Sequence, residues 1–412
     1  MNFLYNLLLL KATILLPLLT IFNKKINLFV NGRKETFSKL NSISKKDKVI
    51  WFHAASLGEF EQGRPIIEEL KQLYKNHKIV VTFFSPSGYE IRKNYALADV
   101  ICYLPLDTKS IMQKFVAKIH PEIAIIIKYE FWPNLLSELK KQQINTILIS
   151  GIFRNKQSFF KWHGGFMRSK LTTFKHFFVQ NEDSKKLLAS INLSNTTIAG
   201  DTRFDRVHEI LQQDNSLDFI TEFKNNRYTV VAGSTWKKDE KLLVYYINNH
   251  ASTDEKFIIA PHNINQEQIK ELQKAINKKT ILYSEKETGN LSEKQVFIID
   301  TIGLLTKIYS YADVAYVGGG LKTGLHNILE PATFGVPIVF GGHKYKKFKE
   351  ATDLLALGSV TIVTNNEEFS STFTTLKNDI DLRIKMGNTN HNYIKENIGA
   401  TKIIMNYIKK TL

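Results

Sequence analysis

The stretch that decides the fold is KVIWFHAASLGEFEQGRPIIEELKQLYKNHKIVVTFF, from Lys48 to Phe84. Two apolar runs, KVIWFHA and KIVVTFF, flank a segment whose apolar side chains recur at helical spacing, RPIIEELKQLYK. Short apolar runs without polar alternation are typical of strands that are buried on both faces of a parallel sheet. A strand, a helix and a second strand in this order predict a βαβ unit.

The same alternation fills most of the chain. The first half continues with the runs ADVICYLP, IAIIIKY, NTILIS and HFFVQN, and the second half restarts with YTVVAGST, KFIIAPH, QVFIID, DVAYVGGG and PIVFGGH. We therefore expect an α/β protein of two Rossmann-like parallel-sheet domains that face a cleft. Neither a Gly-x-Gly-x-x-Gly fingerprint nor a Walker A loop occurs, which argues against a dehydrogenase and against a P-loop NTPase.

The predicted organisation has five parts. It comprises a membrane anchor over 1–23, a first Rossmann-like domain over 24–205, a polar linker over 206–227, a second Rossmann-like domain over 228–395, and a terminal helix over 396–412 that braces the first domain.

Composition points to an anionic partner. The 412 residues carry a formal net charge of +17, which favours nucleic acid, an acidic membrane surface or a phosphorylated substrate. The single cysteine, Cys102, excludes an internal disulfide and any cysteine-rich metal site, and it fits a reducing, cytoplasmic setting.

The N-terminal segment FLYNLLLLKATILLPLLTIF (Phe3 to Phe22) is long enough to cross a bilayer, although Asn6, Lys11 and Pro17 interrupt it. A cleaved signal peptide would have a positive residue before the apolar run and small residues at a cleavage site, and neither occurs here. Basic residues follow the run, which places the rest of the chain in the cytoplasm. We expect a single uncleaved anchor that either spans the bilayer or lies in its interface.

Glu59 allows two interpretations. Ser56-x-x-Glu59 fits a capping box, in which the glutamate serves only to begin a helix. However, a carboxylate at the carboxyl end of a strand is also where α/β sheets bind ligands, and Gly58 and Gly63 are unfavourable in a helix that only needs a sound start. The local pattern leaves both interpretations open.

The segment YVGGGLKTGLHNILEPATFGV (Tyr316 to Val336) predicts a nucleotide site. Its three glycines free the backbone to approach a ligand, and a helix expected to begin near Asn327 would offer its N–H groups to a phosphate. Lys322 and His326 would add positive charge, whereas Glu330 would accept hydrogen bonds from a ribose. The alternative is a tight turn that is followed by an Asn327-x-x-Glu330 capping box.

Other strand ends carry polar side chains. In the second half these are Ser234, Thr235, His262 and Thr301, and Gly303 follows at the same strand-to-helix turn as Thr301.

In the first half, Lys128, Glu130 and Trp132 follow the run IAIIIKY. The lysine and glutamate form either a plain surface salt bridge or a pair that orients a substrate.

A basic and aromatic segment runs from Gly151 to Gln180 without an acidic residue. It contains Arg154, Lys156, Lys161, Arg168, Lys170 and Lys175. Such a surface suits nucleic acid or anionic lipid, and the expected anchor favours lipid. The only Asp-x-Asp pattern, Asp379 to Asp381, is interpreted as solvated surface, so no metal site is expected.

Five motifs taken together resemble the 3-deoxy-D-manno-oct-2-ulosonic acid (Kdo) transferases, GT-B glycosyltransferases of lipopolysaccharide assembly. They are WFHAASLGE, YEFWPN, AGST, GGGLKTGLHNILEPATFGVPIVFG and KYKKFKEA, and the resemblance runs from about Lys48 to Glu350.

The resemblance implies transfer of Kdo from CMP-Kdo to a lipid A precursor (lipid IVA) at the cytoplasmic face of the inner membrane, with no metal, no cofactor and no nucleic-acid partner. It makes Glu59 the general base and Glu130 a second glutamate of the active site, and it assigns the basic segment to the acceptor and the membrane. The implied donor-binding residues are Ser234, Thr235, His262, Gly303, Gly320, Lys322, Asn327 and Glu330.

Two departures from the family concern the donor contacts. Leu304 and Leu305 stand where many members carry an acidic residue, and KTGLHN has one glycine where others often have two. One alternative function is another GT-B lipid glycosyltransferase that uses a UDP sugar. The other is a non-catalytic membrane protein that binds anionic lipid.

Overall fold

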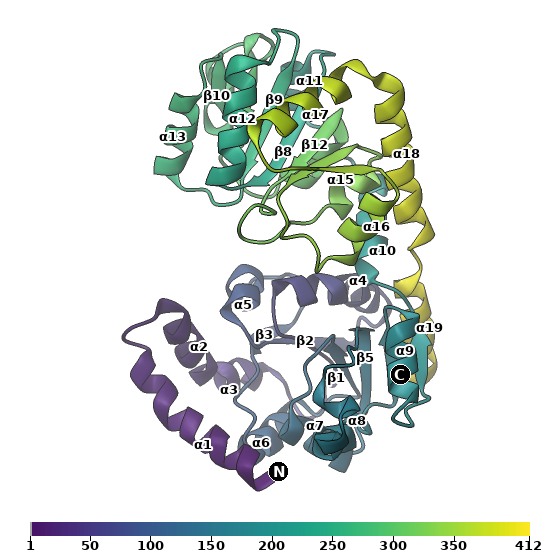
Figure 1. Ribbon diagram of the computed structural model, residues 1–412. Helices are drawn as coiled ribbons and strands as arrows, with labels where there is room; N and C mark the ends of the chain where they lie inside the picture. Colours follow the sequence, from purple (N-terminus) through teal and green to yellow (C-terminus); the bar gives the residue numbers. More distant parts are fainter. Residues whose placement is uncertain (1) are drawn as a thin grey trace. The chain divides into compact units, whose positions relative to one another are not determined.

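The computed structural model describes residues 2–412, which form two compact units (Figure 1). Unit 1 comprises the chain up to Asp205 together with Ile398–Leu412, and unit 2 comprises Arg206–Asn397. Within the described residues each unit contains one seven-stranded sheet, and the strands of both sheets run parallel. The prediction of two parallel-sheet α/β domains is confirmed.

The sheet of unit 1 has the strand order β3-β2-β1-β4-β5-β6-β7. Its strands are β1 (Lys48–Ala54), β2 (His77–Phe83), β3 (Val100–Tyr103), β4 (Ile123–Ile127), β5 (Asn145–Gly151), β6 (His176–Val179) and β7 (Thr196–Ile198). Its helices are α1 (Asn2–Leu19), α2 (Lys24–Lys34), α3 (Thr36–Lys39), α4 (Leu57–Leu73), α5 (Pro86–Arg92), α6 (Lys109–Ile119), α7 (Pro133–Lys141), α8 (Gly165–Leu171), α9 (Glu182–Ala189) and α19 (Ala400–Thr411), while α10 (Thr202–Glu209) crosses the boundary to unit 2.

Both faces of this sheet are buried, which explains the unbroken apolar runs. Along β1, Val49 and Trp51 join a core with residues of α6, α7 and α8, whereas Ile50 and Phe52 join a core with residues of α4 and α19. The C-terminal helix α19 contributes Ile404 and other apolar residues to that second core, and therefore packs on unit 1 although it lies at the far end of the chain.

The N-terminal helices α1 and α2 lie next to each other in unit 1 (Figure 1). The Tyr5 hydroxyl donates to Asp107 Oδ2 over 2.7 Å, and the Asn134 amide donates to Asn6 Oδ1 over 2.8 Å. Within residues 2–412 no single helix is long and apolar enough to cross a membrane. The α1–α2 pair passes by length and composition when taken together, although it is bent by 118°.

The sheet of unit 2 has the strand order β10-β11-β9-β8-β12-β13-β14. Its strands are β8 (Thr229–Thr235), β9 (Lys256–Pro261), β10 (Thr280–Leu282), β11 (Val296–Ile298), β12 (Val314–Val317), β13 (Ile338–Gly341) and β14 (Val360–Val363). Its helices are α11 (Asp218–Lys224), α12 (Lys237–Asn249), α13 (Gln266–Ala275), α14 (Leu305–Ile308), α15 (Leu329–Thr333), α16 (Lys349–Ala356), α17 (Asn366–Asn378) and α18 (Ile380–Glu396).

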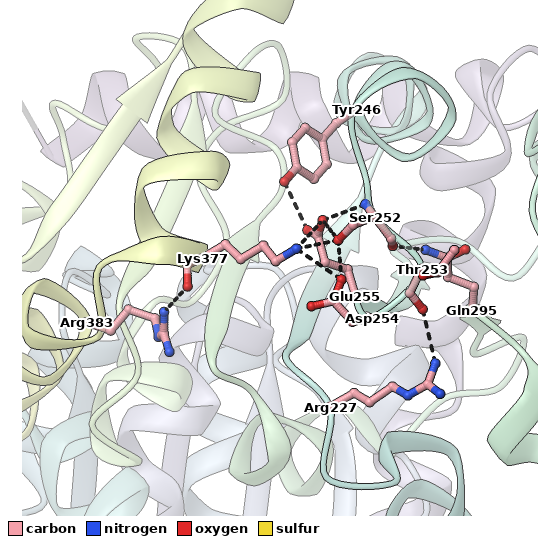
Figure 2. A network of polar contacts seen from close by, with 9 residues as sticks. All are labelled: Arg227, Tyr246, Ser252, Thr253, Asp254, Glu255, Gln295, Lys377 and Arg383. Atoms are coloured by element: carbon pink, nitrogen blue, oxygen red, sulfur yellow. Dashed lines mark hydrogen bonds and ion pairs between the residues drawn. The ribbon is translucent and has the colours of Figure 1, made fainter.

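A polar network closes the amino edge of this sheet (Figure 2). Glu255, buried just before β9, accepts hydrogen bonds from the Tyr246 hydroxyl over 3.0 Å and from the Ser252 N–H over 2.8 Å, and its Oε1 lies 3.3 Å from Lys377 Nζ of α17. Because every oxygen of this buried carboxylate has a partner, the network serves to tie α17 to the sheet.

Candidate functional site

In each unit the sequence order of the strands reverses direction beside the first strand. In unit 1 this point lies between β1 and β4, and in unit 2 it lies between β8 and β12. Parallel α/β sheets bind ligands outside the carboxyl ends of the strands at such a point. The candidate residues of each unit gather there.

Glu59 lies in the first turn of α4, immediately after β1. Its Oε2 accepts a hydrogen bond from the Ala55 N–H over 2.5 Å, while Ser56, the N-cap residue, makes no side-chain capping bond. Among the described residues neither bond of the expected capping box is made, because that box would have Glu59 accept the N–H of Ser56, and Glu59 instead accepts the N–H of the residue before it. Burial raises the pKa of Glu59, and the charge of Glu130 raises it further, against the lowering effects of the Ala55 N–H, Lys128 and His53.

Glu130 follows β4 and is 9% exposed. Its Oε2 lies 3.1 Å from His53 Nε2 and accepts the Trp132 indole N–H over 2.7 Å. Burial alone would raise the pKa of Glu130, but these two partners together lower it. The expected ion pair with Lys128 is thus replaced by a pair with a buried histidine of β1. The pKa values of the two glutamates therefore shift in opposite directions.

Lys128 has a left-handed backbone, with φ of 70°. A non-glycine residue rarely adopts this conformation, and such strain gathers at functional sites. Lys128 Nζ lies 5.3 Å from the centre of the Tyr129 ring, and the Arg154 guanidinium lies 5.5 Å from the same ring. Two cations therefore lie beside the Tyr129 ring, and the charge of Lys128 also acts on Glu59.

In unit 2 the end of β8 is joined to the loop after β12 through Asp239 of α12. Its Oδ2 accepts the Trp236 N–H over 2.9 Å and the Gly319 N–H over 3.0 Å, and its Oδ1 accepts the Tyr316 hydroxyl over 2.8 Å. Near the end of β8, Ser234 has a left-handed backbone with φ of 53°. The register between β8 and β9 shifts at this point. Thr235 is buried and donates to Glu240 Oε1 over 3.1 Å.

Three aromatic side chains stack at this edge of unit 2. The rings of Trp236 and His262 lie 4.7 Å apart, and those of His262 and His326 lie 4.3 Å apart. The Trp236 indole N–H donates to His326 Nε2 over 2.9 Å. Burial and the neighbouring His262 lower the pKa of His326 to about 4. His326 is therefore neutral at physiological pH in the free protein, and the expectation that it adds positive charge is wrong.

The three glycines after β12 are explained by close packing. A Cβ on Gly318 would lie 2.3 Å from the Ser234 carbonyl oxygen, and one on Gly320 would lie 2.1 Å from the Gly341 carbonyl oxygen. Gly319 has φ of 93°. The space that these glycines leave is filled by protein backbone, which supports the tight-turn interpretation of this loop.

The segment after this loop differs from the expected capping box. Helix α15 begins at Leu329, and its N-cap residue, Ile328, makes no side-chain capping bond. Instead, the Asn327 amide donates to Glu330 Oε1 over 3.0 Å and the Thr306 hydroxyl donates to Glu330 Oε2 over 2.8 Å. Gly303, with φ of 95°, faces open space. Glu330 is thus held at the carboxyl edge by two neutral donors.

A cavity of about 270 Å³ lies in unit 2 between the start of α12, α13 and the loop after β12. Thr235, Trp236, Asn263, Lys322 and Thr323 are among the residues that line it. Of the expected donor-binding residues, Thr235 and Lys322 line this cavity. The other six are not among its lining residues, namely Ser234, His262, Gly303, Gly320, Asn327 and Glu330.

The basic segment of unit 1 divides into two groups. Arg168 donates to the carbonyl oxygens of Phe159 and Lys161 over 2.9 and 3.0 Å, and Lys170 donates to Ser137 Oγ over 2.8 Å. Arg168 therefore braces its own segment, whereas Lys170 ties the segment to α7. Arg154 and Lys156 are exposed, and Lys161 is half-buried. Trp162 beside them is 94% exposed, so an indole accompanies the cations on this surface.

Three residues at these edges escaped the sequence reasoning. His53 lies inside an apolar run and resembles a core histidine, and the Glu130 that it meets is 77 positions away. Trp236 and Asp239 form a box around the start of α12, in which Asp239 accepts the Trp236 backbone N–H. The spacing Trp236-x-x-Asp239 was the available signal, without the serine or threonine that usually marks it. Within residues 2–412 no three metal-binding side chains come together.

Residues 31–206 match the family model described as 3-deoxy-D-manno-octulosonic-acid transferase (kdotransferase). A 3-deoxy-D-manno-octulosonic acid transferase of Haemophilus influenzae is 26% identical over 382 residues, which cover 88% of this chain and 87% of that protein. A bifunctional glycosyltransferase/methyltransferase of Fusobacterium nucleatum is 26% identical over 371 residues, which cover 86% of this chain but only 56% of that protein.

Among solved structures, a UDP-GlcNAc 2-epimerase from Neisseria meningitidis bound to UDP-GlcNAc superposes with a TM-score of 0.60. It is 16% identical, and the match covers 88% of this chain and 100% of the epimerase. At this identity the likeness shows the fold alone. It supports the expected GT-B-like architecture of two parallel-sheet domains.

Proposed function

We propose that this chain is a glycosyltransferase that transfers Kdo from CMP-Kdo to a lipid A precursor, lipid IVA. The proposal is supported by the match of residues 31–206 to the Kdo transferase family model and by the similarity to a Kdo transferase over 88% of the chain. Glu59 acts as the general base. It accepts the proton of an acceptor hydroxyl whose oxygen attacks the anomeric carbon of Kdo. The bond from that carbon to the phosphate oxygen breaks, CMP leaves with the electron pair, and the configuration inverts.

The observation that carries this proposal is the state of Glu59. One oxygen is held by the Ala55 N–H, and within residues 2–412 nothing donates to the other oxygen. Burial and the charge of Glu130 raise its pKa, which suits a base that must accept a proton near neutral pH. General-base assistance of this kind is typically worth about 10²–10⁴ in rate.

We assign binding of the CMP-Kdo donor to the carboxyl edge of the sheet in unit 2. The stacked rings of Trp236, His262 and His326 offer a flat neutral surface, and Glu330 offers acceptors for ribose hydroxyls. Lys322 is exposed beside the cavity and would meet the phosphate. A reaction without a metal would rely on such groups to stabilise the departing phosphate.

We assign contact with the membrane to helix α1. Its outward residues include Phe3, Leu8, Ile14 and Leu18, which are 80, 58, 63 and 62% exposed. Its inward side carries Tyr5 and Asn6, whose hydrogen bonds to Asp107 and Asn134 hold α1 on unit 1. An apolar face turned outward on a docked helix suits the cytoplasmic face of the inner membrane. Arg154, Lys156 and Lys161 would then meet an anionic glycolipid or lipid head groups.

The membrane assignment is tested by co-sedimentation with anionic phospholipid vesicles. We expect Ile14→Glu to lower the bound fraction several-fold, because a carboxylate on the outward face must leave the acyl region. Ile302→Glu is the matched control, since Ile302 is an apolar side chain of unit 2 that is 82% exposed. Equal losses in both variants would refute a membrane role specific to α1.

The function is tested by transfer of Kdo from CMP-Kdo to a tetraacylated lipid A precursor, with wild type and Glu59→Gln side by side. Glutamine still accepts the Ala55 N–H but takes no proton, so the rate should fall by about 10²–10⁴ while the fold is retained. Equal rates would leave Glu59 a helix cap and turn attention to Glu130. An inactive wild type would refute the donor or the acceptor.

A second candidate is a GT-B lipid glycosyltransferase that uses a UDP sugar, since the Neisseria structure that shares the fold is bound to UDP-GlcNAc. Thermal stabilisation by CMP and by UDP separates the two. A larger shift with CMP supports Kdo transfer, and a larger shift with UDP supports the alternative. Affinity for anionic lipid without any nucleotide effect would instead favour the non-catalytic role.

A further inference from the structure

We propose that His53 is a positioning residue that sets how strongly Glu130 acts on Glu59, and thereby the pH range in which the base of unit 1 works. The proposal rests on the proposed role of Glu59 as general base. It concerns a side chain that lies in β1 below the edge of the sheet and that need not touch the substrate.

The proton positions of His53 follow from its partners. Nδ1 lies 3.1 Å from the Thr82 carbonyl oxygen and 2.9 Å from Thr82 Oγ1. A carbonyl oxygen only accepts, and Thr82 Oγ1 accepts the Trp51 indole N–H while it donates to the Phe52 carbonyl. Nδ1 is therefore the donor. Nε2 is left to face Glu130 Oε2 over 3.1 Å.

One proton is shared between Nε2 and Glu130. If it sits on His53, a cation faces a carboxylate; if it sits on Glu130, two neutral groups face each other. In both cases the pair is neutral as a whole, and His53 is fully buried, so no water competes for the contact. Glu130 therefore presents less negative charge to Glu59 than an unpaired carboxylate would.

The groups that act on Glu59 are few and come from three elements. Glu130 and Lys128 lie after β4, His53 lies in β1, and the Ala55 N–H lies between β1 and α4. Tyr129 also faces Glu59 and carries the Arg154 guanidinium beside its ring. Glu130 opposes the ionisation of Glu59 and His53 favours it. Removal of Glu130 should therefore lower the pKa of Glu59, and removal of His53 should raise it.

The same sheet contains a matched control. His77 Nε2 of β2 lies 2.8 Å from Glu122 Oε2, and His77 is 9% exposed. This second histidine–glutamate pair lies at the amino edge of the sheet, because His77 begins β2 and Glu122 precedes β4. It has the chemistry of the His53–Glu130 pair without its place beside Glu59.

The experiment measures kcat/KM for Kdo transfer against pH in wild type, His53→Gln, Glu130→Gln and His77→Gln. The rate requires ionised Glu59 and therefore falls as the pH falls through its pKa. We expect the midpoint of this acid limb to rise in His53→Gln and to fall in Glu130→Gln, each by on the order of one pH unit or less. His77→Gln should keep the wild-type midpoint even if its stability is lower.

The ring ¹⁵N resonances of selectively labelled histidine report on the His53–Glu130 contact in the absence of any Kdo transfer. In Glu130→Gln we expect the Nε2 resonance of His53 to move and the Nδ1 resonance, held by Thr82, to stay. This arm decides the proposal if His53→Gln does not fold. An unmoved Nε2 resonance, or acid limbs that shift together or not at all, would overturn it. A wild type without transfer but with the expected ¹⁵N response would refute the proposed function and retain the pair.

Discussion

Glu59 and Asp239 occupy the same position in the two units, the third residue of the helix that follows the first strand. Asp239 is 1% exposed, and its two oxygens accept the Trp236 N–H, the Gly319 N–H and the Tyr316 hydroxyl. Glu59 is half-buried, and one oxygen accepts a single N–H. Burial raises the pKa of both carboxylates. Of these two carboxylates, only Glu59 has an oxygen to which no described residue donates.

The difference shows that one fold position can serve two purposes. Asp239 is a structural cap, because it accepts the N–H of its N-cap residue Trp236, and it also holds the glycine loop through the Gly319 N–H. Glu59 accepts the N–H of Ala55, which precedes the N-cap residue Ser56. The longer glutamate side chain and the small residues Ala55 and Ser56 leave Glu59 reachable at the edge of the sheet. Under the proposed function the two edges have different roles, in which unit 1 supplies proton-transfer groups and unit 2 binds the donor.

The largest effect that tests this comparison is on stability. Asp239→Leu leaves three buried donors without an acceptor, so we expect the free energy of unfolding to fall by about 3 kcal/mol. Glu59→Leu loses one N–H contact and should cost about 1 kcal/mol. Urea unfolding followed by circular dichroism measures both. Similar losses in the two variants would show that Glu59 is as structural as Asp239.

The next effect is the pH dependence of transfer. Burial holds the pKa of Glu59 above 4.5, the ordinary value, so activity should decline about tenfold per pH unit below a midpoint that lies above that value. Asp239→Asn should keep this midpoint even if its rate is lower, because Asp239 exchanges no proton with substrate. A shifted midpoint in Asp239→Asn would contradict the proposal that proton transfer takes place on unit 1.

The sequence predicted what depends on local pattern. The apolar runs located β1 and β4, and the polar residues after them placed Glu59 and Glu130 at strand ends. Contacts between distant segments have no local pattern in the sequence and were not predicted. Gly318 is required by the Ser234 carbonyl and Gly320 by the Gly341 carbonyl, and both carbonyls come from distant parts of the chain. The sequence alone therefore predicted a ligand-binding loop where the structure has a tightly packed turn.

Charge was the other quantity that the sequence could not supply. His326 beside Lys322 suggested a cationic site, but its state depends on burial and on the His262 ring 4.3 Å away. The Trp236 N–H also occupies the nitrogen that would be protonated. Such effects follow from which side chains meet in the fold, and the spacing of residues along the chain does not reveal them.

The smallest expected effect tests whether unit 2 is the uncharged partner in this division. His262→Phe keeps an aromatic ring in the stack and removes the neighbouring imidazole, which is one cause of the low pKa of His326. We therefore expect that pKa to rise from about 4 and to stay below 6.5, its ordinary value, because burial remains. Titration of the ring resonances by NMR measures the change. A fixed or lower value would mean that burial alone sets the charge of this surface. A value at or above the ordinary one would mean that the surface is cationic near neutral pH, and phosphate would then be attracted to the rings as well as to Lys322.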